Sequence, residues 1–235
     1  MNTDNYQQYY SGDAYSLDAR VGAIMKRVYV KMFIGLLVTA FVAFGCSELP
    51  GVKAFFYMNS WAMIGLVIVE FGLLFGISGA INKLSSTVAT LLFLLFSAVN
   101  GLTLFPIFEI YTQTSIYKTF FITAGVFGAM SVYGLFTTQN LAKWGSILFM
   151  ALIGLIICSL VNIFLHSDTM GWIISGAGVL IFVGLTAWDT QQIRNMAAMA
   201  PAESAGRLAT IGALNLYLDF LNLFLFLLRF FGNRE

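Results

Sequence analysis

Two aspartates, Asp189 and Asp219, lie within stretches of sequence that otherwise consist mainly of Leu, Phe, Ile, Ala and Gly. An ionised side chain at the centre of an apolar helix costs about 2.5–3.5 kcal/mol on insertion scales, so such residues usually face a cavity or a partner. On consecutive antiparallel helices, the two carboxyl groups could approach each other. Close carboxylates do not both ionise easily, so the pair would bind and release protons as a unit. Carboxylate oxygens are also the hard ligands that Ca²⁺ prefers, so this pair is a candidate proton sensor and metal site.

The segment that contains Asp219 carries a polar stripe. Asn215, Asp219, Asn222, Phe226 and Arg229 follow one another at spacings of four, three, four and three. These spacings place the five residues on one face of a helix. A polar stripe on a spanning helix favours a buried helix that lines a wet pathway, so we predict that Asn215 and Asn222 line a pore.

The segment that contains Asp189 carries a matching stripe of Ser175, Gly178, Phe182 and Asp189, with Thr186 beside it. We therefore predict Thr186 as a third pore-lining residue. Asp189 lies close to the expected end of its apolar segment. A second interpretation is therefore that Asp189 is solvated at the membrane surface, as part of a helix cap.

Three further charged residues fall within apolar segments. Glu70 lies about halfway through one segment and Arg229 lies toward the end of another, so the two could form a buried ion pair. Lys31 lies near a segment end, where a long side chain can extend its ammonium group to the lipid headgroups.

The composition indicates which elements hold these residues. The chain of 235 residues is 59% hydrophobic and 10% charged, with a mean hydropathy of +0.85. Soluble domains carry about 25% charged residues, because their surface must face water. We therefore predict an all-α polytopic membrane protein, since open strands cannot satisfy their backbone groups in lipid. Residues 1–27 would form a polar N-terminal tail and residues 28–235 a seven-helix transmembrane domain. The expected spans are 28–48, 61–81, 87–108, 116–137, 144–165, 170–189 and 210–231.

The distribution of basic residues predicts the orientation of the chain. With the N-terminus in the cytoplasm, seven Lys and Arg residues fall on the cytoplasmic side and four on the other side, which fits the positive-inside rule. An odd number of spans would place the C-terminus outside, unless the last segment re-enters the membrane instead of crossing it. The net charge of +1 offers no basic patch for nucleic acid, so we expect no nucleic-acid partner.

Two motifs resemble those of a known family. Residues 186–191, Thr-Ala-Trp-Asp-Thr-Gln, look like the "TAYDTQ" signature of the Bax inhibitor-1, or transmembrane Bax inhibitor motif, family. Residues 216–224, Leu-Tyr-Leu-Asp-Phe-Leu-Asn-Leu-Phe, resemble its "LYLDFINLF" signature, and Arg229 follows as expected. Residues 70–73 and 100–103 also fit. Trp188 stands where the family often has Tyr, and the stretch between the two aspartates is longer than expected.

The resemblance implies a seven-helix bundle whose last helix is central. It also implies a pH-sensitive leak channel or exchanger for Ca²⁺, gated by the pair that maps onto Asp189 and Asp219, with Glu70 and Arg229 as a latch nearer the outer side. The short loops are similar to the bacterial branch, which implies a bacterial plasma (inner) membrane. The implied partners are the lipid bilayer, Ca²⁺ and H⁺. No cofactor is expected besides Ca²⁺ as the transported or transiently bound ion.

Two other functions remain open. An intramembrane aspartyl protease also places two aspartates on adjacent helices, but Leu216-Tyr217-Leu218 precedes Asp219 instead of Gly-x-Gly, and no Pro-Ala-Leu run occurs. We therefore expect no enzymatic activity. The alternative is a membrane adaptor that transports nothing and modulates a protease or a stress response through its partners, a membrane protease or another membrane protein.

Overall fold

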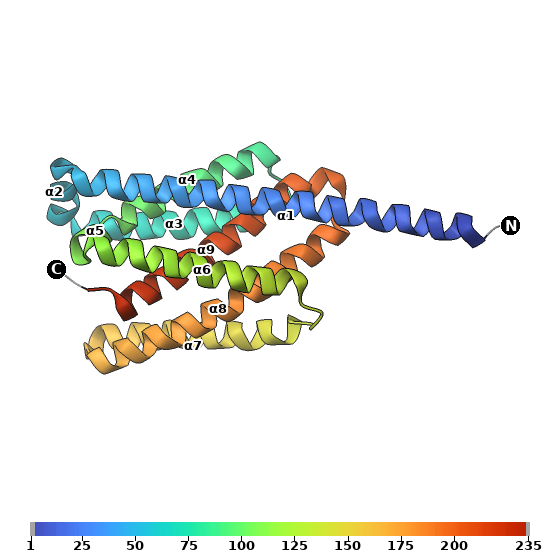
Figure 1. The fold of residues 1–235 in the computed structure, drawn as a ribbon. Coiled ribbons are helices and arrows are strands. Elements are labelled where there is room, and N and C mark those ends of the chain that lie inside the picture. The colour runs from blue at the N-terminus through green and yellow to red at the C-terminus, as the bar shows by residue number, and fades with distance from the viewer. Residues whose placement is uncertain (1–2, 234–235) are drawn as a thin grey trace.

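The structure, a computed structural model, describes the backbone of residues 3–233 and the side chains of residues 17–59 and 61–233. Within this part the chain is helical and forms no strand element, and seven helices are long and apolar enough to cross a membrane (Figure 1). The protein is therefore an all-α polytopic membrane protein, as predicted. Its elements are α1 (Thr3–Glu48), α2 (Pro50–Met58), α3 (Ser60–Ala80), α4 (Ser86–Leu104), α5 (Ile107–Ile110), α6 (Gln113–Phe136), α7 (Ala142–Leu165), α8 (Asp168–Met199), the short 3-10 helix η1 (Ala202–Ser204) and α9 (Ala205–Phe231).

Polar side chains in the short connections determine where several helices begin. The hydroxyl groups of Ser85, Thr112 and Ser167 each accept a hydrogen bond from a backbone amide in the first turn of α4, α6 and α8, respectively. Such caps satisfy amide groups that have no partner within the helix. At His166, α7 ends in a left-handed backbone conformation, with φ 50°. The next helix can therefore reverse direction within two residues.

Two helices extend further than the apolar pattern predicts. α1 begins at Thr3, so much of the predicted tail of residues 1–27 is helical and continuous with the first span, while residues 1–2 lie outside the described part. α8 continues to Met199, ten residues past the predicted end at 189.

α9 runs unbroken for 27 residues, about 40 Å at 1.5 Å per residue, which is enough to cross the membrane once. The last segment is therefore one continuous helix that is long enough to cross.

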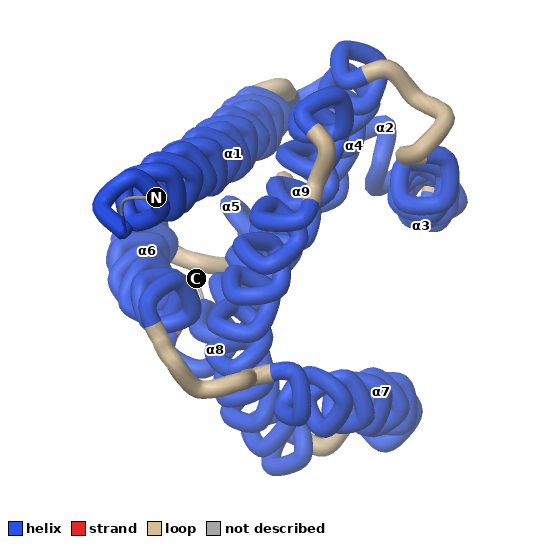
Figure 2. Tube along the Cα trace, turned by 90° about the vertical axis from the view of Figure 1, so that its right-hand side faces the viewer, coloured by secondary structure: helices blue, strands red, loops and turns tan. Residues whose placement is uncertain are grey.

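α9 packs against four other helices: α1, α4, α6 and α8. Figure 2 shows α9 between α4 and α8, while α3 and α7 lie at the edges of the bundle. Of the most apolar part of each span, 67% is buried in α9 but only 6% in α3 and in α7. This difference is what a central last helix requires. α3 packs mainly on α4, and α7 mainly on α8.

Four glycines of α3 share one helical face but do not mediate close packing, although small residues often let spanning helices approach closely. A Cβ atom built at any of these glycines would meet no other atom within 4 Å. They are Gly65, Gly72, Gly76 and Gly79. Close packing occurs instead between α1 and α4, where a Cβ at Gly101 would lie 2.8 Å from the carbonyl oxygen of Thr39.

The short helix α2 is held against α5 by polar contacts. Lys53 Nζ lies 3.1 Å from Glu109 Oε1, and the hydroxyl of Tyr57 donates a hydrogen bond to Glu109. The hydrogen bond to the Glu109 carboxylate raises the pKa of the Tyr57 hydroxyl. These contacts fix the connection between the first two spanning helices at the end of the bundle opposite the N-terminus.

Candidate functional site

The two predicted aspartates line one cavity of about 620 Å³ between α7, α8 and α9. Its polar lining comes from all three helices: Ser159 of α7, Asp189 of α8, and Asn215, Asp219 and Asn222 of α9. The remaining lining residues are apolar: Phe149, Leu152, Leu155, Ile156, Leu160, Ile163, Phe182, Leu185, Trp188, Leu218 and Phe226.

The carboxyl groups of Asp189 and Asp219 contact each other within this cavity, and the Asn215 amide also contacts Asp189. Asp219 is 4% exposed, and its Oδ2 atom is buried without a hydrogen-bond partner. Asp189 is half-buried and lies inside α8, ten residues before the end at Met199. The alternative interpretation of Asp189 as a solvated helix cap is therefore wrong for this structure.

The polar stripe of α9 faces α7 and α8, because Asn215, Asp219, Asn222 and Phe226 all line the cavity. The Asn222 side-chain amide donates a 2.8 Å hydrogen bond to the carbonyl oxygen of Leu218 one turn earlier. This bond orients the amide and leaves its oxygen as a polar group beside Asp219. The sequence periodicity therefore identified the face of α9 that forms the site.

Thr186 does not line the cavity, although the sequence predicted it as a pore-lining residue. Its side chain is fully buried, and its hydroxyl donates a 2.7 Å hydrogen bond to the carbonyl oxygen of Phe182. A threonine in a helix commonly forms this bond to the preceding turn. The polar group of Thr186 is thus satisfied within α8 and is not available to an ion in this conformation.

An aromatic stack borders the cavity toward the C-terminal end of α9. The rings of Phe182 and Phe226 stack with centroids 5.8 Å apart and an interplanar angle of 26°. Gly178 leaves room for the ring of Phe226, since a Cβ at this position would lie 2.6 Å from the ring. The stack therefore separates the aspartates from Arg229, the next residue of the α9 stripe.

Tight packing borders the cavity at the opposite end. One turn before Asn215, a Cβ at Gly212 would lie 3.0 Å from Ile193 and 3.2 Å from Val28. The indole ring of Trp188 packs directly over Gly145 of α7. The aspartates thus lie in a widened region with packed side chains beyond it toward both ends of the bundle.

Glu70 and Arg229 do not pair, which corrects the prediction of an outer latch for this conformation. Among the residues whose side chains are described, the one ion pair is that of α2 with α5. Glu70 contacts Thr103 of α4, and its Oε1 atom is buried without a hydrogen-bond partner. Arg229 is exposed and lies against Gly171 of α8. The two residues stay apart because Glu70 lies on α3, which packs on α4, whereas Arg229 lies beside α8.

Lys31 does not extend its ammonium group to the headgroups. Its Nζ atom donates to Thr90 Oγ1 at 2.8 Å, Thr210 Oγ1 at 2.6 Å and the Gly206 carbonyl oxygen at 3.2 Å. The ammonium group therefore ties α1 to α4 and to the beginning of α9. No local sequence signal reveals this contact, because its three acceptors lie 59 to 179 residues away along the chain.

Gln191 is a further residue with a role that sequence reasoning did not assign. Its Oε1 atom accepts a 2.8 Å hydrogen bond from the Leu141 amide, and its Nε2 atom donates a 2.8 Å bond to the Gln139 carbonyl oxygen. Gln191 thus holds the connection between α6 and α7 against α8. The sequence signal that could have identified Gln191 was its position in the motif of residues 186–191.

The aspartate pair is not a preformed metal cage. Within the described part of the chain, no three His, Cys, Asp or Glu residues gather in a way that could hold a metal ion. The cavity offers the two carboxyl groups of Asp189 and Asp219 and the amides of Asn215 and Asn222. Oxygen ligands of this kind suit a hard cation, and their small number suits a passing ion better than a resident one.

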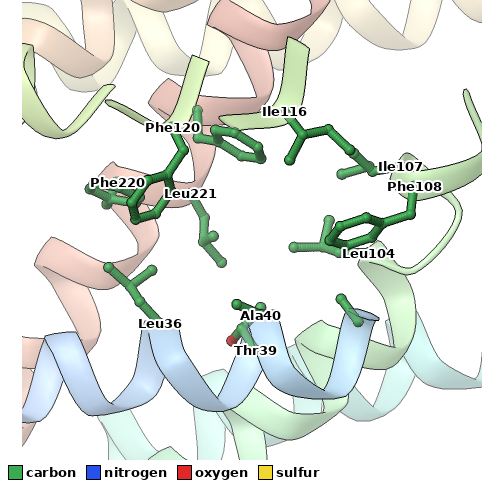
Figure 3. A pocket seen from close by; sticks show the side chains of 12 residues that line it. Leu36, Thr39, Ala40, Leu104, Ile107, Phe108, Ile116, Phe120, Phe220 and Leu221 are labelled. Carbon is green, nitrogen blue, oxygen red and sulfur yellow. The ribbon is translucent and has the colours of Figure 1, made fainter. Parts of the chain in front are cut away.

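A second cavity of about 100 Å³ lies on the other side of α9, between α1, the α4–α6 region and α9, and is lined almost entirely by apolar side chains (Figure 3). Its one polar lining residue is Thr39, whose hydroxyl lies 2.8 Å from the Ser97 carbonyl oxygen and 2.6 Å from the Tyr217 hydroxyl. A cavity without a free polar group offers nothing to an ion, so the aspartate cavity is the candidate site.

Comparison with known proteins identifies the family. Residues 21–235, which include most of the first spanning helix and all of the other six, match the family described as "Inhibitor of apoptosis-promoting Bax1". The chain belongs to this family. The Bax inhibitor resemblance that the two aspartate motifs predicted is therefore confirmed.

Similar members of the Bax inhibitor family occur in several bacteria. The chain is 48% identical to the inner membrane protein YbhL of Escherichia coli (strain K12) over 214 residues, 90% of this chain and 92% of that protein. It is 51% identical to an uncharacterized protein of Borreliella burgdorferi over 213 residues, again 90% and 92% of the two chains. It is 38% identical to an uncharacterized protein of Rickettsia prowazekii over 221 residues, 94% and 93% of the two chains.

Proposed function

We propose that this Bax inhibitor family protein is a pH-sensitive leak channel or exchanger for Ca²⁺, gated by the Asp189–Asp219 pair. The observation that carries the proposal is the environment of Asp219. Its carboxyl group is buried and contacts that of Asp189, and its Oδ2 atom has no hydrogen-bond partner. A carboxylate cannot remain in such a place without a proton or a cation nearby. The pair therefore has the chemistry to exchange one for the other.

In the proposed mechanism, a proton shared between Asp189 and Asp219 holds α8 and α9 together. When both carboxyl groups ionise, their repulsion favours either separation of the two helices or entry of a cation. α9 is the element that moves, and its displacement would unstack Phe226 from Phe182. Low pH then favours the closed state, and flux rises as the pH increases.

The proposed ion pathway uses oxygen ligands that a hard cation accepts. Asp189 and Asp219 supply negative charge, and Asn215 and Asn222 supply amide oxygens along the same wall. Thr186 joins this pathway only if α8 rotates, because its hydroxyl is bonded within its own helix. Ca²⁺ is the cargo of this reaction, and we propose no enzymatic step and no other cofactor.

We further propose that the protein lies in a bacterial inner membrane with its N-terminus in the cytoplasm. The relative from Escherichia coli is named an inner membrane protein. The seven basic residues assigned to the cytoplasmic side lie at one end of the bundle: Arg20, Lys26, Arg27, Lys83, Lys143, Arg194 and Arg207. Such clustering follows the positive-inside rule.

Calcium flux into proteoliposomes across roughly pH 5 to 8 tests the mechanism, because a carboxyl pair gains and loses protons as a unit when the pH changes. Wild-type protein should conduct Ca²⁺ more rapidly as pH rises. Asp219→Asn should lose most of this pH dependence while the protein remains folded. Asp168→Asn, which removes an exposed aspartate at the start of α8, is the matched control and should behave as the wild type.

The outcome also decides between the calcium leak and the membrane adaptor. Calcium flux that does not change with pH in the wild type would refute gating by the aspartate pair. If flux never exceeds that of empty vesicles, the adaptor function becomes the better explanation, with a membrane protease or another membrane protein as its partner.

A further inference from the structure

The aspartate cavity is larger and more apolar than a metal ion needs. Its volume of about 620 Å³ falls within the range of roughly 300–1,000 Å³ that is typical of sites for small organic molecules. A metal ion takes oxygen ligands on most sides. Here the polar groups gather around Asp189 and Asp219, and the α7 wall is hydrocarbon apart from Ser159.

The α7 wall of this cavity is open toward the surface that lipid covers. Four of its lining side chains remain largely exposed: Phe149 at 60%, Ile156 at 51%, Leu160 at 54% and Ile163 at 62%. α7 packs mainly on α8 and stands at the edge of the bundle (Figure 2). A molecule dissolved in the bilayer can therefore reach the cavity from the side, without crossing the packed ends.

The buried end of the cavity selects for positive charge. Asp219 Oδ2 has no hydrogen-bond donor, and Asp189 adds a second carboxyl group beside it. The aromatic rings of Trp188 and Phe226 border the same space, and aromatic faces attract cations. Negative charge, aromatic rings and a hydrocarbon wall together match a cation that carries a large apolar body.

We propose that this cavity binds a lipophilic organic cation, an onium or protonated amine on an apolar body, that enters from the bilayer between α7 and α9. The cationic centre lies at Asp219 and Asp189, and the apolar body lies along α7. The inference goes beyond the calcium leak and does not rest on it, although both use Asp219.

Direct binding to the full-length protein in lipid nanodiscs tests the inference. The probe is radiolabelled tetraphenylphosphonium, which is permanently cationic, and the matched control is tetraphenylborate, which has nearly the same shape and the opposite charge. We expect saturable binding of tetraphenylphosphonium at one site per chain, above its partition into empty nanodiscs. Tetraphenylborate should show only the partition into lipid.

Two kinds of variant locate the site. Asp219→Asn removes the charge and should weaken binding by about tenfold or more, as expected for the loss of one charge-assisted contact. Ser159→Trp keeps both aspartates but fills the cavity, and it should abolish binding. Asp168→Asn lies outside the cavity and should bind as the wild type. Each variant is first shown to elute as a single folded species.

Absence of saturable binding, equal binding of the two probes, or unchanged affinity in both cavity variants would overturn the inference. The readout is independent of ion flux, so the two proposals can fail separately. Tetraphenylphosphonium binding without calcium flux would refute only the leak, whereas calcium flux without such binding would refute only the organic-cation site.

Discussion

Replacement of Lys31 by methionine tests whether the contact between α1, α4 and α9 stabilises the bundle. The substitution keeps the length and most of the volume of the side chain but removes the ammonium group. That group donates hydrogen bonds to Thr90, Thr210 and the Gly206 carbonyl oxygen. We expect Lys31→Met to destabilise the protein because these three bonds join segments that are distant in sequence.

The magnitude follows from two opposing contributions. A hydrogen bond with a charged partner contributes about 1.5–3 kcal/mol, so three such bonds set an upper limit of roughly 5–9 kcal/mol on the loss. Removal of a half-buried ammonium group recovers its desolvation cost, which is on the order of several kcal/mol. Thr90 and Thr210 keep partners, because both also donate to carbonyl oxygens of their own helices. We therefore expect a net loss of about 2 kcal/mol.

Equilibrium unfolding of the purified protein in mixed micelles measures this loss. Lys118→Met is the matched control, because Lys118 is an exposed lysine on α6, and it should change stability by less than about 0.5 kcal/mol. A Lys31→Met protein as stable as the wild type would show that the three bonds do not offset the desolvation cost of the ammonium group. The structural role assigned to this lysine would then be wrong.

Three further substitutions test other contacts. Gly134→Ala should cost about 1–3 kcal/mol in the same unfolding assay, because the new Cβ collides with an α8 backbone carbonyl, whereas Gly125→Ala on the same helix faces open space and should be nearly neutral. Gln191→Ala should accelerate hydrogen exchange at the Leu141 amide by about tenfold or more, since that amide loses its acceptor, and unchanged exchange would contradict the assignment. Phe226→Ala removes one ring of the aromatic stack and should raise calcium flux several-fold at fixed pH, so a lower flux would contradict the role of the stack as a barrier.

The spans and the polar faces could be predicted from the sequence because each depends on local constraints. A helix that crosses lipid needs about 20 apolar residues, and this requirement alone located all seven spans. Helical periodicity placed Asn215, Asp219 and Asn222 on one face, and all three line the cavity with Asp189. The connection lengths made α8 and α9 consecutive antiparallel helices, which brought the two aspartates together.

The remaining features depend on which helices become neighbours, and hydropathy carries no such information. Glu70 and Arg229 were expected to pair because a charged side chain is costly in lipid. Glu70, however, lies on the helix that packs on α4, and Arg229 lies beside α8. Lys31 was assigned to the headgroups because its acceptors lie on distant segments. The last ten residues of α8 are more polar than its spanning part. The apolar pattern therefore placed the end of this helix too early, at residue 189.

The position of α9 has a consequence for biosynthesis. α1, α4 and α3 pack as one group and α6, α8 and α7 as another, and the two groups meet mainly through α9. Among the described helices, α9 is also the last to be synthesised, because it follows the others in chain order. During translation the membrane therefore holds two partly assembled halves whose inner faces lack their common neighbour. The two halves can join fully only after α9 has been synthesised, and a chain that stops before α9 leaves both halves exposed to membrane quality control.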